Sequence, residues 1–184
     1  MDRSPKVVLV TGMQAAGKST IAPLLAARLG PPAATLDGDV FYRGVVAGAA
    51  HMTPDPSPEA VRQLELRYDA TALMAQHYAD AGFDFVCSDI ILGEHVEKWF
   101  ALLRGVETHL VVLIPSVESI VEREIARGGR NSYRDWGDSL EDGIRALQAG
   151  LEEIPRRGLW LDTTGQTPEQ SADEILTNLP KARW

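Results

Sequence analysis

The chain has 184 residues, of which 45% are hydrophobic and 24% are charged, and its formal net charge is −8. These values are ordinary for a globular protein with a substantial core, and we expect a single domain over residues 1–184. The acidic balance argues against a nucleic-acid partner, and no apolar run approaches the roughly 20 residues that span a bilayer, so no membrane partner is expected.

The N-terminal residues and the cysteine content bear on the compartment. The stretch 1-MDRSP-5 leads directly into an apolar run and lacks the features of a signal peptide, so we expect a cytoplasmic protein. The chain has one cysteine, Cys87, within an apolar run. We interpret it as a small core residue and not as a nucleophile.

Short apolar runs alternate along the chain with segments that are typical of helices. The expected strands are 6–10, 33–36, 83–87, 109–114 and 159–162. The expected helices are 18–29, 40–50, 59–80, 93–104, 117–127, 139–153 and 168–179. Strands joined by helical crossovers predict a parallel sheet covered on both faces, which is a three-layer α/β fold. Ligands of such sheets bind beyond the carboxyl ends of the strands.

A glycine-rich segment follows the first strand and fits the pattern G-x-x-x-x-G-K-[ST] of a phosphate-binding loop. It consists of Gly12, Met13, Gln14, Ala15, Ala16, Gly17, Lys18 and Ser19. The backbone N–H groups of such a loop, together with the positive end of the next helix, surround one anion. We predict that Lys18 reaches the outer phosphates, that Ser19 ligates Mg²⁺ and that Thr20 touches the α-phosphate of a nucleotide. The alternative is a glycine-rich turn with a solvated lysine.

Acidic residues follow the second and third strands. Asp37 and Asp39 flank a glycine, and we predict that Asp37 helps to hold Mg²⁺ and that Asp39 accepts a proton from a hydroxyl attacking the γ-phosphate. An ordinary helix N-cap at Asp39 is the alternative. Asp89, after the third strand, is a candidate for organising Mg²⁺ or binding substrate, or else a cap. Asp37, Asp39, Arg43 and Asp89 are together the candidate substrate contacts, although Arg43 fits a solvated surface position equally well.

Basic residues and a turn near the C-terminus are expected to complete the nucleotide site. Arg123 and Arg127 share one helix face, and Arg130 follows a Gly-Gly pair at the start of a lid over about residues 128–140. We expect Arg123 and the turn with Thr164 and Gly165 to contact adenine, and Arg127 and Arg130 to balance charge on the transferred phosphoryl group. A solvated helix and a plain strand-to-helix turn are the alternatives.

With these residues in place, the chain resembles small P-loop kinases over nearly its whole length, and among them the chloramphenicol phosphotransferase-like group. The shared segments are 15-AAGKS-19, an aspartate 21 residues past the loop lysine, 89-DIILG-93, 123-REIARGGR-130 and 161-LDTT-164. The resemblance implies a P-loop NTPase fold with a five-stranded sheet and a short lid. It also implies phosphorylation of a small-molecule hydroxyl by ATP and Mg²⁺, with Asp39 as the base.

Several alternatives stay open at this point. The segment 36-LDGDVFYRG-44 is also similar to adenylylsulfate kinases and gluconate kinases, and residues 51–59 do not match a chloramphenicol pocket. A hydrolase that uses water as the acceptor would need the same residues, and so would a non-catalytic ATP sensor. Both adenine and guanine are compatible with the sequence, which also predicts no particular oligomeric state.

Overall fold

A five-stranded parallel sheet forms the centre of the computed structural model, which describes residues 4–128, 133 and 135–184. The strand order is β2-β3-β1-β4-β5, and every neighbouring pair is parallel. The strands are β1 (Lys6–Gly12), β2 (Ala33–Asp37), β3 (Asp84–Ser88), β4 (Glu107–Leu113) and β5 (Leu159–Leu161). The predicted five-stranded parallel sheet is therefore confirmed.

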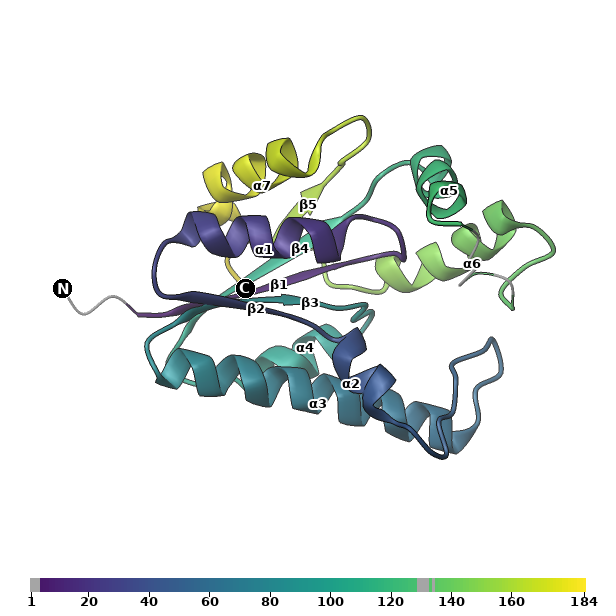
Figure 1. Cartoon of the computed structure of the whole chain (residues 1–184), viewed down its shortest axis with the longest axis horizontal. Coiled ribbons are helices and arrows are strands. Elements are labelled where there is room, and N and C mark those ends of the chain that lie inside the picture. Colours follow the sequence, from purple (N-terminus) through teal and green to yellow (C-terminus); the bar gives the residue numbers. More distant parts are fainter. Residues whose placement is uncertain (1–3, 129–132, 134) are drawn as a thin grey trace.

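Helices cover both faces of this sheet, as predicted. They are α1 (Lys18–Leu29), α2 (Asp39–Gly44), α3 (Pro58–Asp80), α4 (His95–Ala101), α5 (Val117–Ala126), α6 (Leu140–Glu152) and α7 (Pro168–Thr177), followed by the 3₁₀ turn η1 (Leu179–Ala182). Figure 1 shows α1 and α7 on one face, α3 and α4 on the other, and α5 and α6 beyond the carboxyl ends of the strands. None of the helices described is long and apolar enough to cross a membrane.

The central strand shows why this sequence folds as a three-layer structure. Val7 and Leu9 of β1 belong to the apolar cluster on the α3 and α4 side, and Val8 and Val10 belong to the cluster on the α1 and α7 side. All four side chains are fully buried, because alternate residues of a strand point to opposite faces and both faces are covered. Cys87 of β3 is buried in the first cluster, which confirms the predicted core position.

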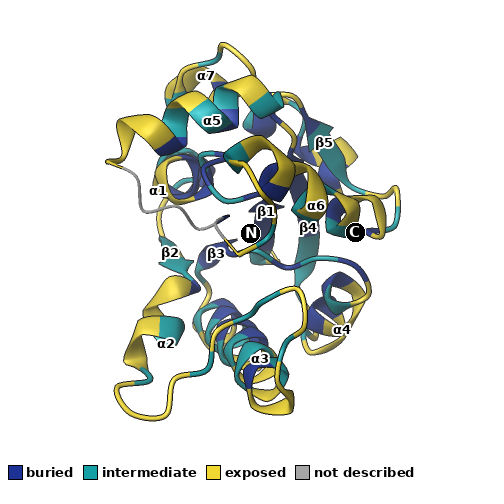
Figure 2. Ribbon diagram, turned by 90° about the vertical axis from the view of Figure 1, so that its right-hand side faces the viewer, coloured by how far each residue is buried: buried dark blue, intermediate teal, exposed yellow. Residues whose placement is uncertain are grey.

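The predicted helix over residues 40–50 is wrong in length, because α2 ends at Gly44. The next residue, Val45, has an extended backbone, and Gly48 has a φ of +69°, which an α-helix does not accommodate. Residues 45–57 then form a loop that is largely exposed in Figure 2. Its end is well defined, since the Ser57 side chain accepts the Ala60 N–H at the start of α3.

The two-faced core leads to a prediction for a matched pair of leucine substitutions. Leu25 of α1 is fully buried, whereas Leu73 of α3 is 66% exposed. Leu25→Ala should lower the free energy of unfolding by about 3 kcal/mol, because it leaves a cavity in the core. Leu73→Ala should change it by less than about 0.5 kcal/mol. Urea unfolding of both variants is the measurement, and equal losses of stability would contradict this packing of α1.

Candidate active site

The phosphate-binding segment, residues 12–20, contains the end of β1, a tight turn over residues 13–17 and the start of α1, and its backbone depends on two glycines. Gly12 has a φ of +143°, and a Cβ on it would lie 2.6 Å from the carbonyl oxygen of Leu113 on β4. Gly17 has a φ of +103° and is the N-cap of α1, where no side-chain cap is present among the described residues. The backbone N–H groups of Lys18 and Ser19 can therefore bind an anion, as the phosphate-binding pattern predicts, whereas the Thr20 N–H donates to the Gly17 carbonyl oxygen at 3.1 Å.

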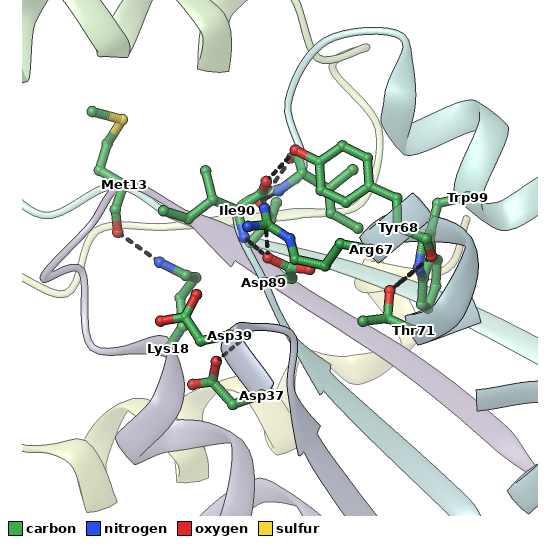
Figure 3. A network of polar contacts seen from close by, with 12 residues as sticks. Met13, Lys18, Asp37, Asp39, Arg67, Tyr68, Thr71, Asp89, Ile90 and Trp99 are labelled. Atoms are coloured by element: carbon green, nitrogen blue, oxygen red, sulfur yellow. Dashed lines mark hydrogen bonds and ion pairs between the residues drawn. The ribbon is translucent and has the colours of Figure 1, made fainter. Parts of the chain in front are cut away.

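Lys18 is the first residue of α1 and is buried, with 8% of its surface exposed. Its Nζ donates a hydrogen bond to the carbonyl oxygen of Met13 at 2.8 Å (Figure 3). Burial lowers the pKa of Lys18 to about 8, and the carboxylates of Asp89, Asp37 and Asp39 oppose that shift. A phosphate group next to Lys18 would supply the charge compensation that its buried position lacks.

A pocket opens where β1, β2 and β3 end, and it brings together most of the predicted phosphate and acidic residues. Its lining residues are Gln14, Ala15, Gly17, Lys18, Ser19, Asp37, Asp39, Ser88, Asp89, Ile90 and Arg127. Arg43, in contrast, is exposed and lines neither this pocket nor the second one described below. The shared edge of a parallel sheet therefore places a cationic loop opposite several carboxylates.

The two aspartates around the end of β2 have different environments. The Asp37 Oδ1 accepts the backbone N–H of Asp39 at 3.0 Å, whereas Asp39 is the first residue of α2 and is exposed. The N-cap position itself is occupied by Gly38. Asp39 is therefore not the N-cap of α2, and Figure 3 shows its carboxylate near Lys18. An exposed carboxylate at this position can accept a proton from a ligand in the pocket.

Asp89 is a buried acid, with 4% of its surface exposed. Its Oδ1 accepts the Ile90 N–H at 2.7 Å and lies 3.2 Å from the Nη2 of Arg67. Burial raises the pKa of Asp89 to about 6, and the Arg67 guanidinium opposes this shift. Sequence reasoning missed Arg67, because it lies on α3 between the exposed Leu66 and the buried Tyr68. Helical periodicity does not say whether such a boundary residue faces solvent or a carboxylate.

A second pocket of about 340 Å³ lies on the other side of the phosphate-binding turn. Its lining residues are Ala15, Gly17, Thr20, Ile21, Arg123, Ala126, Arg127, Thr163, Gln166, Pro168 and Ser171. The turn after β5 contributes through Thr163 and Gln166, and not through the predicted Thr164 and Gly165. The Thr164 Oγ1 instead accepts the backbone N–H of Ser116, just before α5. The Thr163 Oγ1 is buried and has no hydrogen-bond partner among the described residues.

The predicted arginines lie around this second pocket. Arg123 donates hydrogen bonds to the carbonyl oxygens of Ala16 and Thr163, at 3.1 and 3.2 Å, and so joins the phosphate-binding turn to the loop after β5. Arg127 is exposed and lines both pockets. Arg130 lies outside the described residues, as do the other residues among 129–132 and residue 134 of the predicted lid.

Tyr133, within the predicted lid, is a contact that sequence reasoning did not identify. Its side chain is fully buried, and its hydroxyl donates a hydrogen bond to the carbonyl oxygen of Gln14 at 2.6 Å. A Cβ on Gly143 of α6 would lie 2.5 Å from the Tyr133 carbonyl oxygen. Tyr133 is therefore packed tightly between the phosphate-binding turn and α6.

The chemistry of the first pocket fits Mg²⁺ if phosphate oxygens take part. Ser19 and Asp37 both line it and offer the oxygen ligands that Mg²⁺ prefers. Among residues 4–128, 133 and 135–184, no group of three or more histidine, cysteine or acidic side chains is arranged to hold a metal ion. Mg²⁺ commonly uses one or two protein ligands together with phosphates and water, so the two residues are sufficient.

The lowered pKa of Lys18 predicts how nucleotide affinity depends on pH. Lys18 is charged below about pH 8 and neutral above it in the free protein, and a bound phosphate favours the charged form. The dissociation constant for ATP–Mg²⁺ should therefore be constant from pH 7 to 7.5 and then rise by up to about tenfold per pH unit. Calorimetric titrations between pH 7 and 9.5 measure this dependence.

Lys18→Arg provides the matched control, because a guanidinium stays charged over the whole range. Whatever its absolute affinity, this variant should show a flat profile. A flat profile for the unsubstituted protein up to pH 9.5 would contradict the assignment of the titrating group to Lys18.

Comparison with known proteins agrees with this geometry. The model of a family described as chloramphenicol phosphotransferase-like protein matches residues 5–180. A shorter match, 42% identical over 52 residues, is to a tRNA dimethylallyltransferase from Streptomyces coelicolor and covers 28% of this chain. The matched segment is only 17% of the length of that relative.

Solved structures of kinases have the same fold. A sugar kinase from Janibacter sp. HTCC2649 has a TM-score of 0.65 at 18% identity, over 98% of this chain and 96% of that chain. The APS kinase of Mycobacterium tuberculosis, in complex with AMPPNP and APS, has a TM-score of 0.64 at 22% identity, over 96% and 98%. A gluconokinase from Sinorhizobium meliloti has a TM-score of 0.61 at 18% identity, over 97% and 93%. These likenesses show a three-layer P-loop fold. The match over residues 5–180 shows that the chain belongs to the chloramphenicol phosphotransferase-like family.

Proposed function

We propose that the protein is a kinase that transfers the γ-phosphoryl group of ATP–Mg²⁺ to a hydroxyl group of a small molecule. The observation that carries this proposal is the first pocket, where the phosphate-binding turn with Lys18 faces the carboxylate of Asp39. A phosphate donor and a proton acceptor on opposite sides of one pocket are what phosphoryl transfer to a hydroxyl requires. A cytoplasmic location remains a prediction from the sequence.

In this proposal the two pockets hold different parts of ATP. The phosphates lie on residues 12–20, and the adenine lies in the second pocket between Arg123 and the turn containing Gln166. The guanidinium of Arg123 donates to three backbone carbonyls, so its plane is fixed for stacking on a purine. The buried Thr163 hydroxyl, which has no partner among the described residues, is available to the nucleotide.

The chemistry follows from the positions of the charged groups. Asp39 accepts the proton of the acceptor hydroxyl while the oxygen of that hydroxyl forms a bond to the γ-phosphorus. The bond from the γ-phosphorus to the β,γ-bridging oxygen breaks, and ADP is released. Lys18 and Arg127, with Arg130 outside the described residues, balance charge on the transferred group. Mg²⁺, held by Ser19 and Asp37, would supply further charge neutralisation. Catalysis then consists mainly of positioning and electrostatic stabilisation.

The acceptor is proposed to lie between α2 and the start of α3, beside the loop over residues 45–57. Gln63 of α3 holds this loop, since its Oε1 accepts the Ala50 N–H at 3.0 Å and its Nε2 donates to the Gly48 carbonyl at 2.8 Å. Tyr42 and His51 also contact each other through the phenol oxygen and the Nδ1. We propose Asp89 and Arg43 as further acceptor contacts.

A panel of hydroxylated small molecules, including sugars, nucleosides and antibiotics, tests this function. With ATP–Mg²⁺, one class of compound should raise ADP formation and gain about 80 mass units, the increase for a phosphoryl group. Phosphate release that is unchanged across the panel and lost in Lys18→Ala would indicate a hydrolase. ATP binding without any turnover would indicate a sensor. Either result would overturn the proposal.

The proposed base leads to a prediction for Asp39→Asn, which keeps the shape of the side chain but removes the proton acceptor. Acceptor-dependent kcat should fall by about 10²- to 10⁴-fold, the usual contribution of a general base. The dissociation constant for ATP should stay within about twofold. Asp80→Asn, at the exposed C-terminal end of α3 and away from the proposed site, is the matched control and should leave both values unchanged. Full turnover of Asp39→Asn would remove Asp39 from this role.

A further inference from the structure

Arg67 contacts two elements besides its own helix, although it lies in the middle of α3. Its Nη2 is 3.2 Å from the Oδ1 of Asp89, directly after β3. The central carbon of its guanidinium group lies 5.7 Å from the ring centroid of Tyr42 on α2 and 5.2 Å from that of Tyr68 on α3. Both distances are within the range of cation–π interactions. One largely buried side chain therefore links α3, α2 and the residue after β3. Figure 3 shows Arg67 beside Asp89 and Tyr68.

The carboxylate that Arg67 holds also supports the turn that begins α2. The Asp89 Oδ2 lies against Gly38, so that a Cβ on Gly38 would be only 2.0 Å from this oxygen. The Gly38 N–H in turn donates to the carbonyl oxygen of Ser88 at 2.9 Å. Gly38 separates Asp37 from Asp39. The turn that carries both proposed catalytic carboxylates thus rests on Asp89.

The ion pair between Arg67 and Asp89 is expected to contribute little to the stability of the fold. The side chains of Arg67 and Asp89 are 11% and 2% exposed, so both charges lose most of their hydration. The Nε of Arg67 and the Oδ2 of Asp89 are buried without hydrogen-bond partners among the described residues. A buried pair with unsatisfied atoms seldom stabilises a fold relative to apolar side chains of similar size. We therefore expect the ion pair to matter for the positions of the groups that it contacts, and not for the stability of the fold.

We propose that Arg67 is a positioning residue that fixes α2, and with it Asp39, from two points. One point is the start of α2, which Arg67 reaches through Asp89 and Gly38, and the other is Tyr42 in the first turn of α2. Only the effect of Arg67 on catalysis rests on the proposed function. The contacts with α2 exist whichever acceptor is used, so they can be tested separately.

Amide hydrogen exchange of Gly38 tests the positioning role directly. The Gly38 N–H is buried and hydrogen-bonded, so it reports release of the turn from β3. Arg67→Met keeps the length of the side chain and should accelerate this exchange at least tenfold relative to the amides of β1, which report global unfolding. Arg62→Met is the matched control on α3, because Arg62 is exposed and pairs with Glu59, and it should leave the ratio unchanged.

Should Arg67→Met not fold because Asp89 is left unpaired, Arg67→Met combined with Asp89→Asn removes that charge and keeps the support under Gly38. The same acceleration is then expected. Unchanged Gly38 exchange, relative to β1, in the variant that folds would overturn the positioning role.

Kinetics test the consequence for catalysis. With an acceptor identified, Arg67→Met should lower kcat at least tenfold while the KM for ATP changes less than twofold, because the phosphate-binding turn is untouched. Arg67→Lys should recover only part of kcat, since an ammonium lacks the planar group that contacts Tyr42. Faster Gly38 exchange with an unchanged kcat would overturn the link to Asp39. Absence of any acceptor-dependent transfer would refute the proposed function, and the exchange result would still decide the contact between Arg67 and α2.

Discussion

The buried charge of Lys18 is the constraint on which the rest of this site depends. Burial lowers its pKa to about 8, and nearby carboxylates limit that shift, with Asp89 having the largest effect among them. Asp89 is itself buried, and the guanidinium of Arg67 counteracts the resulting rise in its pKa. Asp89 therefore links the charge of Lys18 to Arg67 on α3. Asp89 thus favours the charged form of Lys18, and Arg67 favours the charged form of Asp89.

Two close backbone approaches make this arrangement possible. Gly12 lies against the Leu113 carbonyl of β4, and Gly38 lies against the Asp89 carboxylate at the end of β3. In both places a side chain would force neighbouring strand ends apart. Parallel strands end at one edge of the sheet, and the absence of these two Cβ atoms lets the loops that follow them pack closely enough to share a pocket. Gly12 and Gly38 therefore determine the positions of the charged groups as well as the conformation of the turns.

The sequence predicts those features that depend on neighbouring residues. The apolar runs predict the strands because both faces of this sheet are buried, and the glycine-rich segment predicts the turn around Lys18 because its conformation is local. Arg67, Tyr133 and Thr163 were missed because their partners are distant in the chain and depend on tertiary packing. The length of α2 was overestimated, because the apolar and small residues after Gly44 are typical of a helix. The positive φ of Gly48, which excludes a helix there, is not apparent from the sequence.

Transfer from ATP to an organic hydroxyl, and not to water, is the central claim, and the fate of solvent oxygen tests it most directly. The reaction is run with ATP–Mg²⁺ and the active acceptor in ¹⁸O-labelled water, and both the phosphorylated product and free phosphate are examined by mass spectrometry. Attack by the acceptor's own oxygen predicts an unlabelled phosphate ester formed in step with ADP. Labelled free phosphate formed in step with ADP, with no phosphate ester, would show that water is the acceptor and would contradict the claim.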